Sequence, residues 1–232
     1  MIEYTTKYDV RKTMYQKFAE SVAKRGDKPC FYYYNNTLTW NQVADLVDAC
    51  AAGMLANGVR KGDRVIICAP NMPQCIAAIY AVNKIGAVAS MLHPLSVASE
   101  AKYAVDLVDA KFAFCFDVSE KAGNPKGVML SSEAINNLSY ELVDVVEDTI
   151  KIDLDPDHDA MLTALPVFHG FGFALCMHVS MCVGMPQSLW PQFDAKMCSD
   201  AIRKYHINYV FGVPDFFEKV YKAGYLKGVD MS

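Results

Sequence analysis

The sequence lacks the features of several protein classes. It has no uninterrupted apolar run of the roughly 18 residues that a membrane-spanning helix needs. Its most apolar stretch, GFGFALCMHVSMCVGMP, is interrupted by His178, Ser180 and several glycines, and it is expected to form a buried helix. The N-terminus is polar and mixed in charge, unlike a secretory signal. We therefore expect a cytoplasmic protein with no transmembrane segment.

A long basic run is also missing. The chain has 22 basic and 26 acidic residues, for a net charge of -4, which makes nucleic acid and anionic membranes poor candidate partners. None of the eight cysteines pairs with another at C-x-x-C spacing, so no spacing supports a metal site. Most of them lie in apolar patterns such as VIICAP and FAFCFD, which is typical of reduced, buried thiols.

What is present is the composition of a globular protein, with 53% hydrophobic and 21% charged residues. Short apolar runs at 65–69, 87–92 and 111–116 alternate with helical patterns that begin at Pro73 and near Val97. This alternation predicts an α/β fold in which parallel or mixed sheets are flanked by helices.

Local signals mark several boundaries. Thr39 and Gln42 fit a capping box, Asn57-Gly58 and Gly86 suit helix ends, and Asn35-Asn36 suits a hairpin turn. In the second half of the chain, the patterns predict four helices and two strands. The helices are expected at 131–147, 171–183, 195–205 and from 214, and the strands at 160–165 and 208–212.

The pentapeptide Gly123, Asn124, Pro125, Lys126 and Gly127 has the composition of a phosphate-binding turn. Glycines let backbone N–H groups approach a phosphate closely, proline stiffens the turn and lysine supplies a cation. It is not a Walker A loop, because G-x-x-x-x-G-K-[ST] is absent. Taken alone, the pentapeptide is a weak signal, and it favours an ordinary surface turn.

A second candidate site is Phe168, His169, Gly170 and Phe171, within PVFHGFGF. An imidazole among aromatic side chains and glycines suits the lining of a ligand pocket. The alternatives are a buried histidine with a satisfied hydrogen bond, core aromatic residues, and glycines that serve only a tight turn or close packing.

Four stretches together resemble the adenylate-forming superfamily, which includes acyl-CoA synthetases, luciferases and the adenylation domains of peptide synthetases. GNPKGVMLSSEAINN resembles the second half of that family's phosphate loop, and LTALPVFHGFGF resembles its Pro-x-Phe-His-x-x-Gly motif. The stretch from LTWNQV to SMLHP resembles its N-terminal region, and INYVFGVPDFFEKV resembles a later strand and turn. The order of these motifs carries the resemblance more than any one of them.

The resemblance implies that a carboxylic acid attacks ATP to give an acyl-adenylate, and that coenzyme A then takes the acyl group. Gly123 to Gly127 would hold the phosphates of ATP with Mg²⁺, and Phe168 to Phe171 would line the acyl and adenylate pocket. An amino-acid adenylation domain of the peptide-synthetase type remains an alternative. A non-catalytic fragment or interaction module with the same fold is another.

The sequence also departs from the family pattern. The family's loop begins with a Ser-Gly-Thr-Thr-Gly half, of which only Gly123 remains, and only six residues separate it from Phe116. We therefore expect a segment to be missing at Ala122–Gly123, through a deletion or through an interrupted sequence. The Tyr-Gly-x-Thr-Glu motif, the ribose-binding aspartate and the C-terminal lid with its catalytic lysine are not found. Residues 1–232 thus resemble a partial N-terminal domain, expected to be inactive alone, and no catalytic residue or metal ligand is identified. The acid, the thiol acceptor and the oligomeric state stay open.

Overall fold

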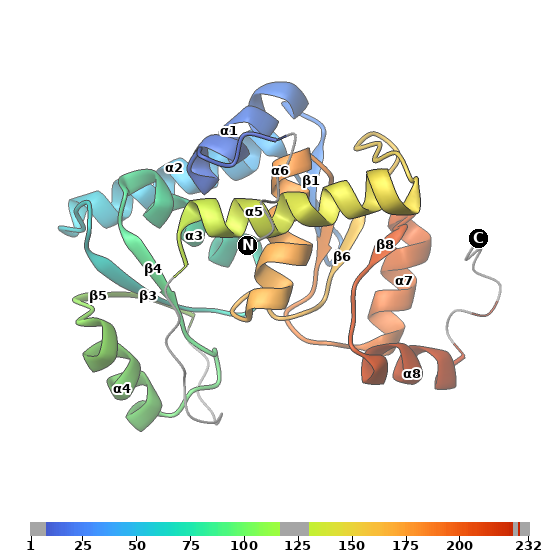
Figure 1. Ribbon diagram of the computed structural model, residues 1–232. Coiled ribbons are helices and arrows are strands. Elements are labelled where there is room, and N and C mark those ends of the chain that lie inside the picture. Colours follow the sequence, from blue (N-terminus) through green and yellow to red (C-terminus); the bar gives the residue numbers. More distant parts are fainter. Residues whose placement is uncertain (1–7, 117–129, 225–226, 228–232) are drawn as a thin grey trace, which may run out of the picture.

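The structure is a computed structural model that describes residues 8–116, 130–224 and 227. Two β-sheets form its framework, as Figure 1 shows. The larger sheet has the order β2-β1-β7-β6-β8 and is mixed, because β1 and β2 are antiparallel while its other pairs are parallel. The smaller sheet, β4-β3-β5, is entirely parallel. The strands are β1 (Pro29–Tyr33), β2 (Asn36–Thr39), β3 (Arg64–Cys68), β4 (Val88–Met91), β5 (Phe112–Cys115), β6 (Met161–Thr163), β7 (Gln187–Leu189) and β8 (Tyr209–Val210).

Helices cover both sheets, and this arrangement confirms the predicted α/β class. The α-helices are α1 (Met14–Arg25), α2 (Trp40–Ala56), α3 (Pro73–Ile85), α4 (Ala98–Val108), α5 (Ser132–Asp144), α6 (Val179–Val183), α7 (Ala195–Tyr205) and α8 (Pro214–Lys222). Two π-helices are η1 (Val145–Ile150) and η2 (Gly172–His178). In Figure 1, α4 lies on one face of the small sheet, and α7 and α8 lie beside β8. Helix α3 is buried along most of its length.

The small sheet shows how strand periodicity sets the two faces. Side chains alternate along a strand, so Val65 and Ile67 of β3 join the main core. Ile66 and Cys68 point to the other face and pack in a separate cluster with residues of α4. All three strands predicted from the apolar runs are observed here, each within two residues of its expected bounds.

Several predicted boundaries are confirmed by hydrogen bonds. The backbone N–H of Gln42 donates to Thr39 Oγ1 at 3.2 Å, and the N–H of Thr39 donates to Gln42 Oε1 at 2.9 Å, which closes the capping box of α2. Pro73 occupies the first turn of α3. Gly86 ends that helix at a φ of 80°, in the left-handed region that favours glycine.

Other expectations need correction. The predicted helix at 171–183 is π-helical over η2 and α-helical only over α6, and the helix predicted to reach residue 147 passes into η1 after Asp144. Apolar spacing does not distinguish a ladder of i+4 bonds from one of i+5 bonds, so the π-helices could not be predicted. The hairpin turn comprises Tyr34-Asn35, because Asn36 pairs with Tyr33. Tyr34 adopts a left-handed φ of 53° while its ring packs edge-on against Trp190 at 5.5 Å. Strand β7 was not predicted.

Candidate functional site

The carboxyl ends of strands from both sheets meet at one place. In sheets with parallel strands, ligands bind beyond the carboxyl ends. Asn71 follows β3 and His93 follows β4 in the small sheet, and the segment from 164 to 171 follows β6 in the large sheet. The rings of His93 and Phe168 lie 4.5 Å apart between centroids. The two sheets therefore present a shared edge, and the predicted aromatic-histidine segment lies on it.

Asn71 holds that segment in place. Its side chain is 1% exposed, and its Nδ2 donates to the carbonyl oxygens of Leu165 at 2.8 Å and Thr163 at 3.3 Å. Its Oδ1 accepts from the backbone N–H of Val167 at 2.8 Å. One buried amide, in the loop after β3, thus pairs with three backbone groups at the end of β6 and in the segment that follows it. Sequence reasoning missed Asn71; the available signal was a polar residue between Pro70 and Pro73.

The segment that contains the second candidate site forms a tight turn into η2. The N–H of His169 donates to the carbonyl of Pro166 at 3.1 Å, and the N–H of Phe173 donates to the carbonyl of His169 at 2.9 Å. Gly172 lies directly against the preceding backbone, because a Cβ there would be 2.3 Å from the carbonyl oxygen of Pro166. Gly170 has open space around it. The suggestion of close packing therefore holds for Gly172 and not for Gly170.

The four predicted pocket residues differ in exposure. His169 and Gly170 are exposed, Phe171 is 38% exposed and Phe168 is half-buried. The alternative interpretation of His169 as a buried histidine is therefore wrong. Its imidazole is accessible at the edge where the strand ends meet. His93 has no partner pattern in the sequence and is expected to be structural, but the structure places its ring against Phe168 at the candidate site.

A buried polar network lies behind this edge, at the end of η2. The two ring nitrogens of His178 contact Tyr80 Oη at 2.6 Å and Asn136 Oδ1 at 2.8 Å. Since Asn136 Nδ2 donates to the carbonyls of Val10 and Lys12, its Oδ1 accepts, and His178 carries its proton on Nε2. Burial lowers the pKa of His178 to about 3, so the ring is neutral. This network joins α3, α5 and the N-terminal segment to η2.

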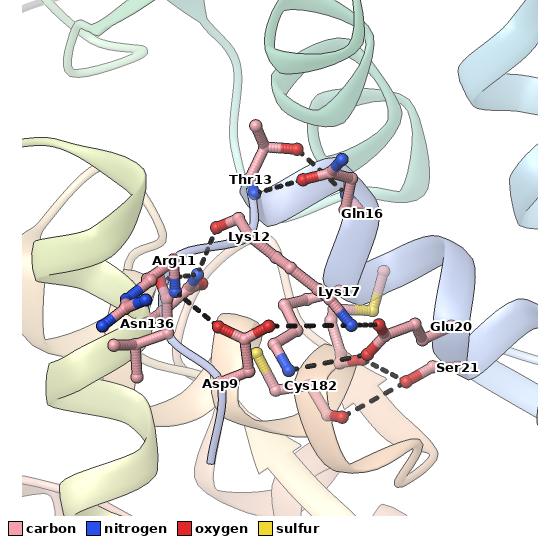
Figure 2. Close-up of polar contacts among 12 residues, drawn as sticks. Asp9, Arg11, Lys12, Thr13, Gln16, Lys17, Glu20, Ser21, Asn136 and Cys182 are labelled. Atoms are coloured by element: carbon pink, nitrogen blue, oxygen red, sulfur yellow. Dashed lines mark hydrogen bonds and ion pairs between the residues drawn. The ribbon is translucent and has the colours of Figure 1, made fainter. Parts of the chain in front are cut away.

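Figure 2 shows a second polar cluster around α1. Lys17 is 5% exposed, and its Nζ lies 3.5 Å from Glu20 and 5.0 Å from the ring centroid of Tyr140. Lys12 also contacts Glu20, and Ser21 Oγ donates to the carbonyl of Met181 at 2.7 Å. These groups satisfy one another and attach α1 to the segment of α6, so we assign the cluster a structural role.

The predicted phosphate loop, Gly123 to Gly127, and the expected junction at Ala122–Gly123 lie outside the described residues. The flanking elements are described. Strand β5 ends at Cys115, and its ladder extends by one bond, from the N–H of Phe116 to the carbonyl of Cys68 at 2.8 Å. Helix α5 begins after Ser131, whose Oγ accepts from the N–H of Ala134 at 3.1 Å. Residues 117–129, called the loop interval below, therefore follow the same carboxyl edge of the small sheet that His93 and Asn71 follow.

Among residues 8–116 and 130–224, the structure contains no group of three or more His, Cys, Asp or Glu side chains placed to hold a metal ion. The described residues therefore do not form a protein-only Mg²⁺ site. In the same part of the chain, no helix has the length and apolar character needed to cross a membrane.

The framework defines a class of protein: an α/β protein whose parallel strands end at a shared edge, which is the place where folds of this class bind ligands. The chain belongs to the family of AMP-binding enzymes, whose pattern it matches over residues 18–122 and 122–232. The two matched segments meet at residue 122 and together cover most of the chain. This confirms the resemblance to the adenylate-forming superfamily that the motifs indicated.

Individual relatives agree with this family. The chain is 26% identical to a feruloyl-CoA synthase of Amycolatopsis over 84% of its own length and 47% of the relative. It is 21% identical to 4-coumarate–CoA ligase 1 of Petroselinum crispum, over 92% of this chain and 49% of that protein. The N-terminal domain of FACL13 from Mycobacterium tuberculosis superposes with a TM-score of 0.80 at 18% identity, covering 95% of this chain and 67% of that domain. The chain thus spans about half the length of these two curated relatives, and its fold is that of an N-terminal domain.

Proposed function

We propose that the protein to which this chain contributes activates a carboxylic acid with ATP and passes the acyl group to coenzyme A. The observation that carries the proposal is the shared edge of the two sheets, where His93, Asn71 and the segment Phe168 to Phe171 meet and from which the loop interval departs. The family match and the names of the relatives as CoA synthases and ligases support it.

In this proposal the aromatic segment and the loop have separate tasks. Phe168 and Phe171 present apolar surface beside the accessible imidazole of His169, which suits an acid's organic tail and the adenylate. The loop of Gly123 to Gly127 holds the phosphates, and Lys126 counters the charge that grows on the leaving pyrophosphate. Holding the acid in line with the α-phosphate lowers the entropic part of the barrier. The resemblance implies Mg²⁺ in addition.

We also propose that a segment of the family's loop is missing at Ala122–Gly123. The alignments with the two relatives run over 239 and 271 residues, longer than the 232-residue chain, so the relatives contain residues with no counterpart here. The family match divides at residue 122. Because the family's ribose-binding aspartate and lid lysine are also not found in the sequence, we propose that residues 1–232 alone do not catalyse acyl activation.

The test is ATP–pyrophosphate exchange across a panel of carboxylic acids, measured on the 232-residue chain and on the full-length gene product. We expect exchange only by the full-length protein. Lys126→Ala should reduce its rate on the order of 10²-fold, the usual effect of losing one contact to transition-state charge. Lys121→Ala, outside the pentapeptide, is the matched control and should keep the full rate. Normal exchange by Lys126→Ala would contradict the assigned role of this lysine.

The same assay separates the alternatives. Exchange with amino acids but no formation of a CoA thioester would favour an adenylation domain of the peptide-synthetase type. A full-length protein that neither exchanges pyrophosphate with any acid nor binds ATP would favour a non-catalytic interaction module. Exchange by the 232-residue chain itself would show that the chain is sufficient.

A further inference from the structure

Two cysteines that are far apart in sequence face each other across the small sheet. Cys68 is the last residue of β3 and Cys115 is the last residue of β5, and the two are direct partners in the parallel register. Neighbouring strands lie about 4.8 Å apart, within the range of roughly 4.4–6.8 Å between Cα atoms that a disulfide spans. No sequence spacing could indicate this pair, because the register depends on the fold.

The two side chains also point to the same face. Ile66 and Cys68 belong to the cluster on the α4 side of the sheet, and Ala113 and Cys115 are their respective partners on β5. Directly paired residues on neighbouring strands share a face, so the two thiols lie next to each other. The neighbouring thiol of Cys115 contributes, after burial, to raising the pKa of Cys68 to about 11.

Accessibility distinguishes the two thiols. Cys115 is exposed, whereas Cys68 is half-buried and its Sγ lies 3.6 Å from the carbonyl oxygen of His93. An oxidant from solvent therefore meets Cys115 first. The thiolate is the reactive form of cysteine, and the high pKa of Cys68 makes it the second thiol to react.

We propose that Cys68 and Cys115 form a thiol pair that low-molecular-weight disulfides oxidise reversibly to an intrachain disulfide. The thiolate of Cys115 attacks one sulfur of the oxidant, forming a mixed disulfide and releasing one reduced thiol. Cys68 then loses its proton and attacks the sulfur of Cys115, which expels the second reduced thiol. In total, the disulfide of the oxidant is reduced to two thiols, and the two cysteine thiols lose two hydrogens and form one S–S bond.

This pair borders the candidate site. Cys68 precedes Asn71 by three residues, and Cys115 is followed by Phe116 and the loop interval. Oxidation would join the two strands covalently where the chain turns into the site. The proposal does not depend on acyl activation, because it rests on the register and on the exposure of the thiols.

The experiment treats the folded chain with increasing amounts of oxidised glutathione, quenches with acid, alkylates the remaining thiols and maps the peptides. We expect the free thiols to fall from eight to six, with Cys68 joined to Cys115 and recovery of both by a dithiol reductant. In Cys68→Ser, Cys115 should stop at the mixed disulfide with glutathione. Cys50→Ser removes a half-buried thiol of α2 outside the pair, and it should behave like the unchanged protein.

Two results would overturn the proposal. One is a wild-type chain in which Cys115 accumulates only as the mixed disulfide, because this would show that Cys68 does not reach it. The other is a map that joins either cysteine to a different partner. The wild-type map decides the matter even if a serine variant fails to fold.

Discussion

Replacement of Asn71 by alanine is expected to destabilise the protein more than any surface amide replacement. Asn71 pairs three backbone groups, and one of them, the N–H of Val167, belongs to a residue with no exposed surface. A buried N–H left without a partner costs about 1–3 kcal/mol. Loss of the bonds to the carbonyls of Leu165 and Thr163 adds to this cost, although carbonyls tolerate incomplete pairing better. We therefore expect the free energy of unfolding to fall by about 3 kcal/mol, which corresponds to a more than 100-fold change in the unfolding equilibrium constant.

The assay is urea unfolding followed by the fluorescence of Trp40 and Trp190. The two rings are buried in different core clusters, one in the main core and one with residues of α7 and α8, so they report on different parts of the molecule. Asn41→Ala is the matched control, because its amide is exposed on α2 and bonds Asp27 at the surface. It should change stability by no more than about 0.5 kcal/mol.

A second variant tests the direction of the hydrogen bonds. Asn71→Asp keeps an oxygen that can accept from the N–H of Val167, but it places a carboxylate oxygen against the carbonyl of Leu165. We expect it to be at least as destabilising as alanine at neutral pH, because a buried charge is left without a partner. If Asn71→Ala unfolds at the same urea concentration as Asn41→Ala, the amide does not hold the segment as we infer.

Two further predictions concern other buried groups. Gly172→Ala should lower the free energy of unfolding by at least about 1–3 kcal/mol, because the new Cβ would meet backbone carbonyls that cannot rotate away. Gly170→Ala should change it by no more than about 0.5 kcal/mol in the same urea assay. Equal effects of the two variants would contradict the observed packing. The pKa of His178 is about 3 in the folded protein, so below about pH 6.5 the imidazole gains a proton in the unfolded chain and not in the folded one. The free energy of unfolding should therefore fall by about 1.4 kcal/mol for each pH unit between 6.5 and 3. His178→Gln should remove this part of the pH dependence, and an unchanged slope in urea titrations at pH 6 and pH 5 would refute it.

The features that could be predicted from the sequence are those with local causes. The capping box of α2 needs only Thr39 and Gln42 three residues apart, and the ends of α3 need only Pro73 and Gly86. The alternation of apolar runs and helices sufficed for the α/β class. The family resemblance further indicated Phe168 to Phe171 as a candidate site, and the structure places this segment after β6 with His169, Gly170 and Phe171 exposed.

The remaining features depend on contacts between distant residues. Nothing local indicates that β1 pairs with β7, more than 150 residues later, or that the strands divide into two sheets. The roles of Asn71 and His93 arise from the meeting of those sheets. The sequence marks only the polar position of Asn71 between Pro70 and Pro73, and not the groups that Asn71 and His93 contact. The contrast between Gly170 and Gly172 also depends on the fold. The backbone at Pro166 passes close to Gly172 and leaves no room for a side chain there, whereas Gly170 has open space around it.

The geometry of the site therefore depends on residues outside its motif. Phe168 follows β6 of the large sheet, but its ring packs on His93, which follows β4 of the small sheet. The backbone before Phe168 is held by Asn71, which follows β3 of the small sheet. A relative shift of the two sheets would separate Phe168 from His93 without changing any motif residue. For this reason the Asn71→Ala variant, in a protein that activates acids, is expected to lose activity through misplacement of the aromatic segment. Under the proposed function, this variant should bind the acid more weakly while ATP binding is retained, because the aromatic segment follows β6 of the large sheet and the proposed phosphate loop follows β5 of the small sheet.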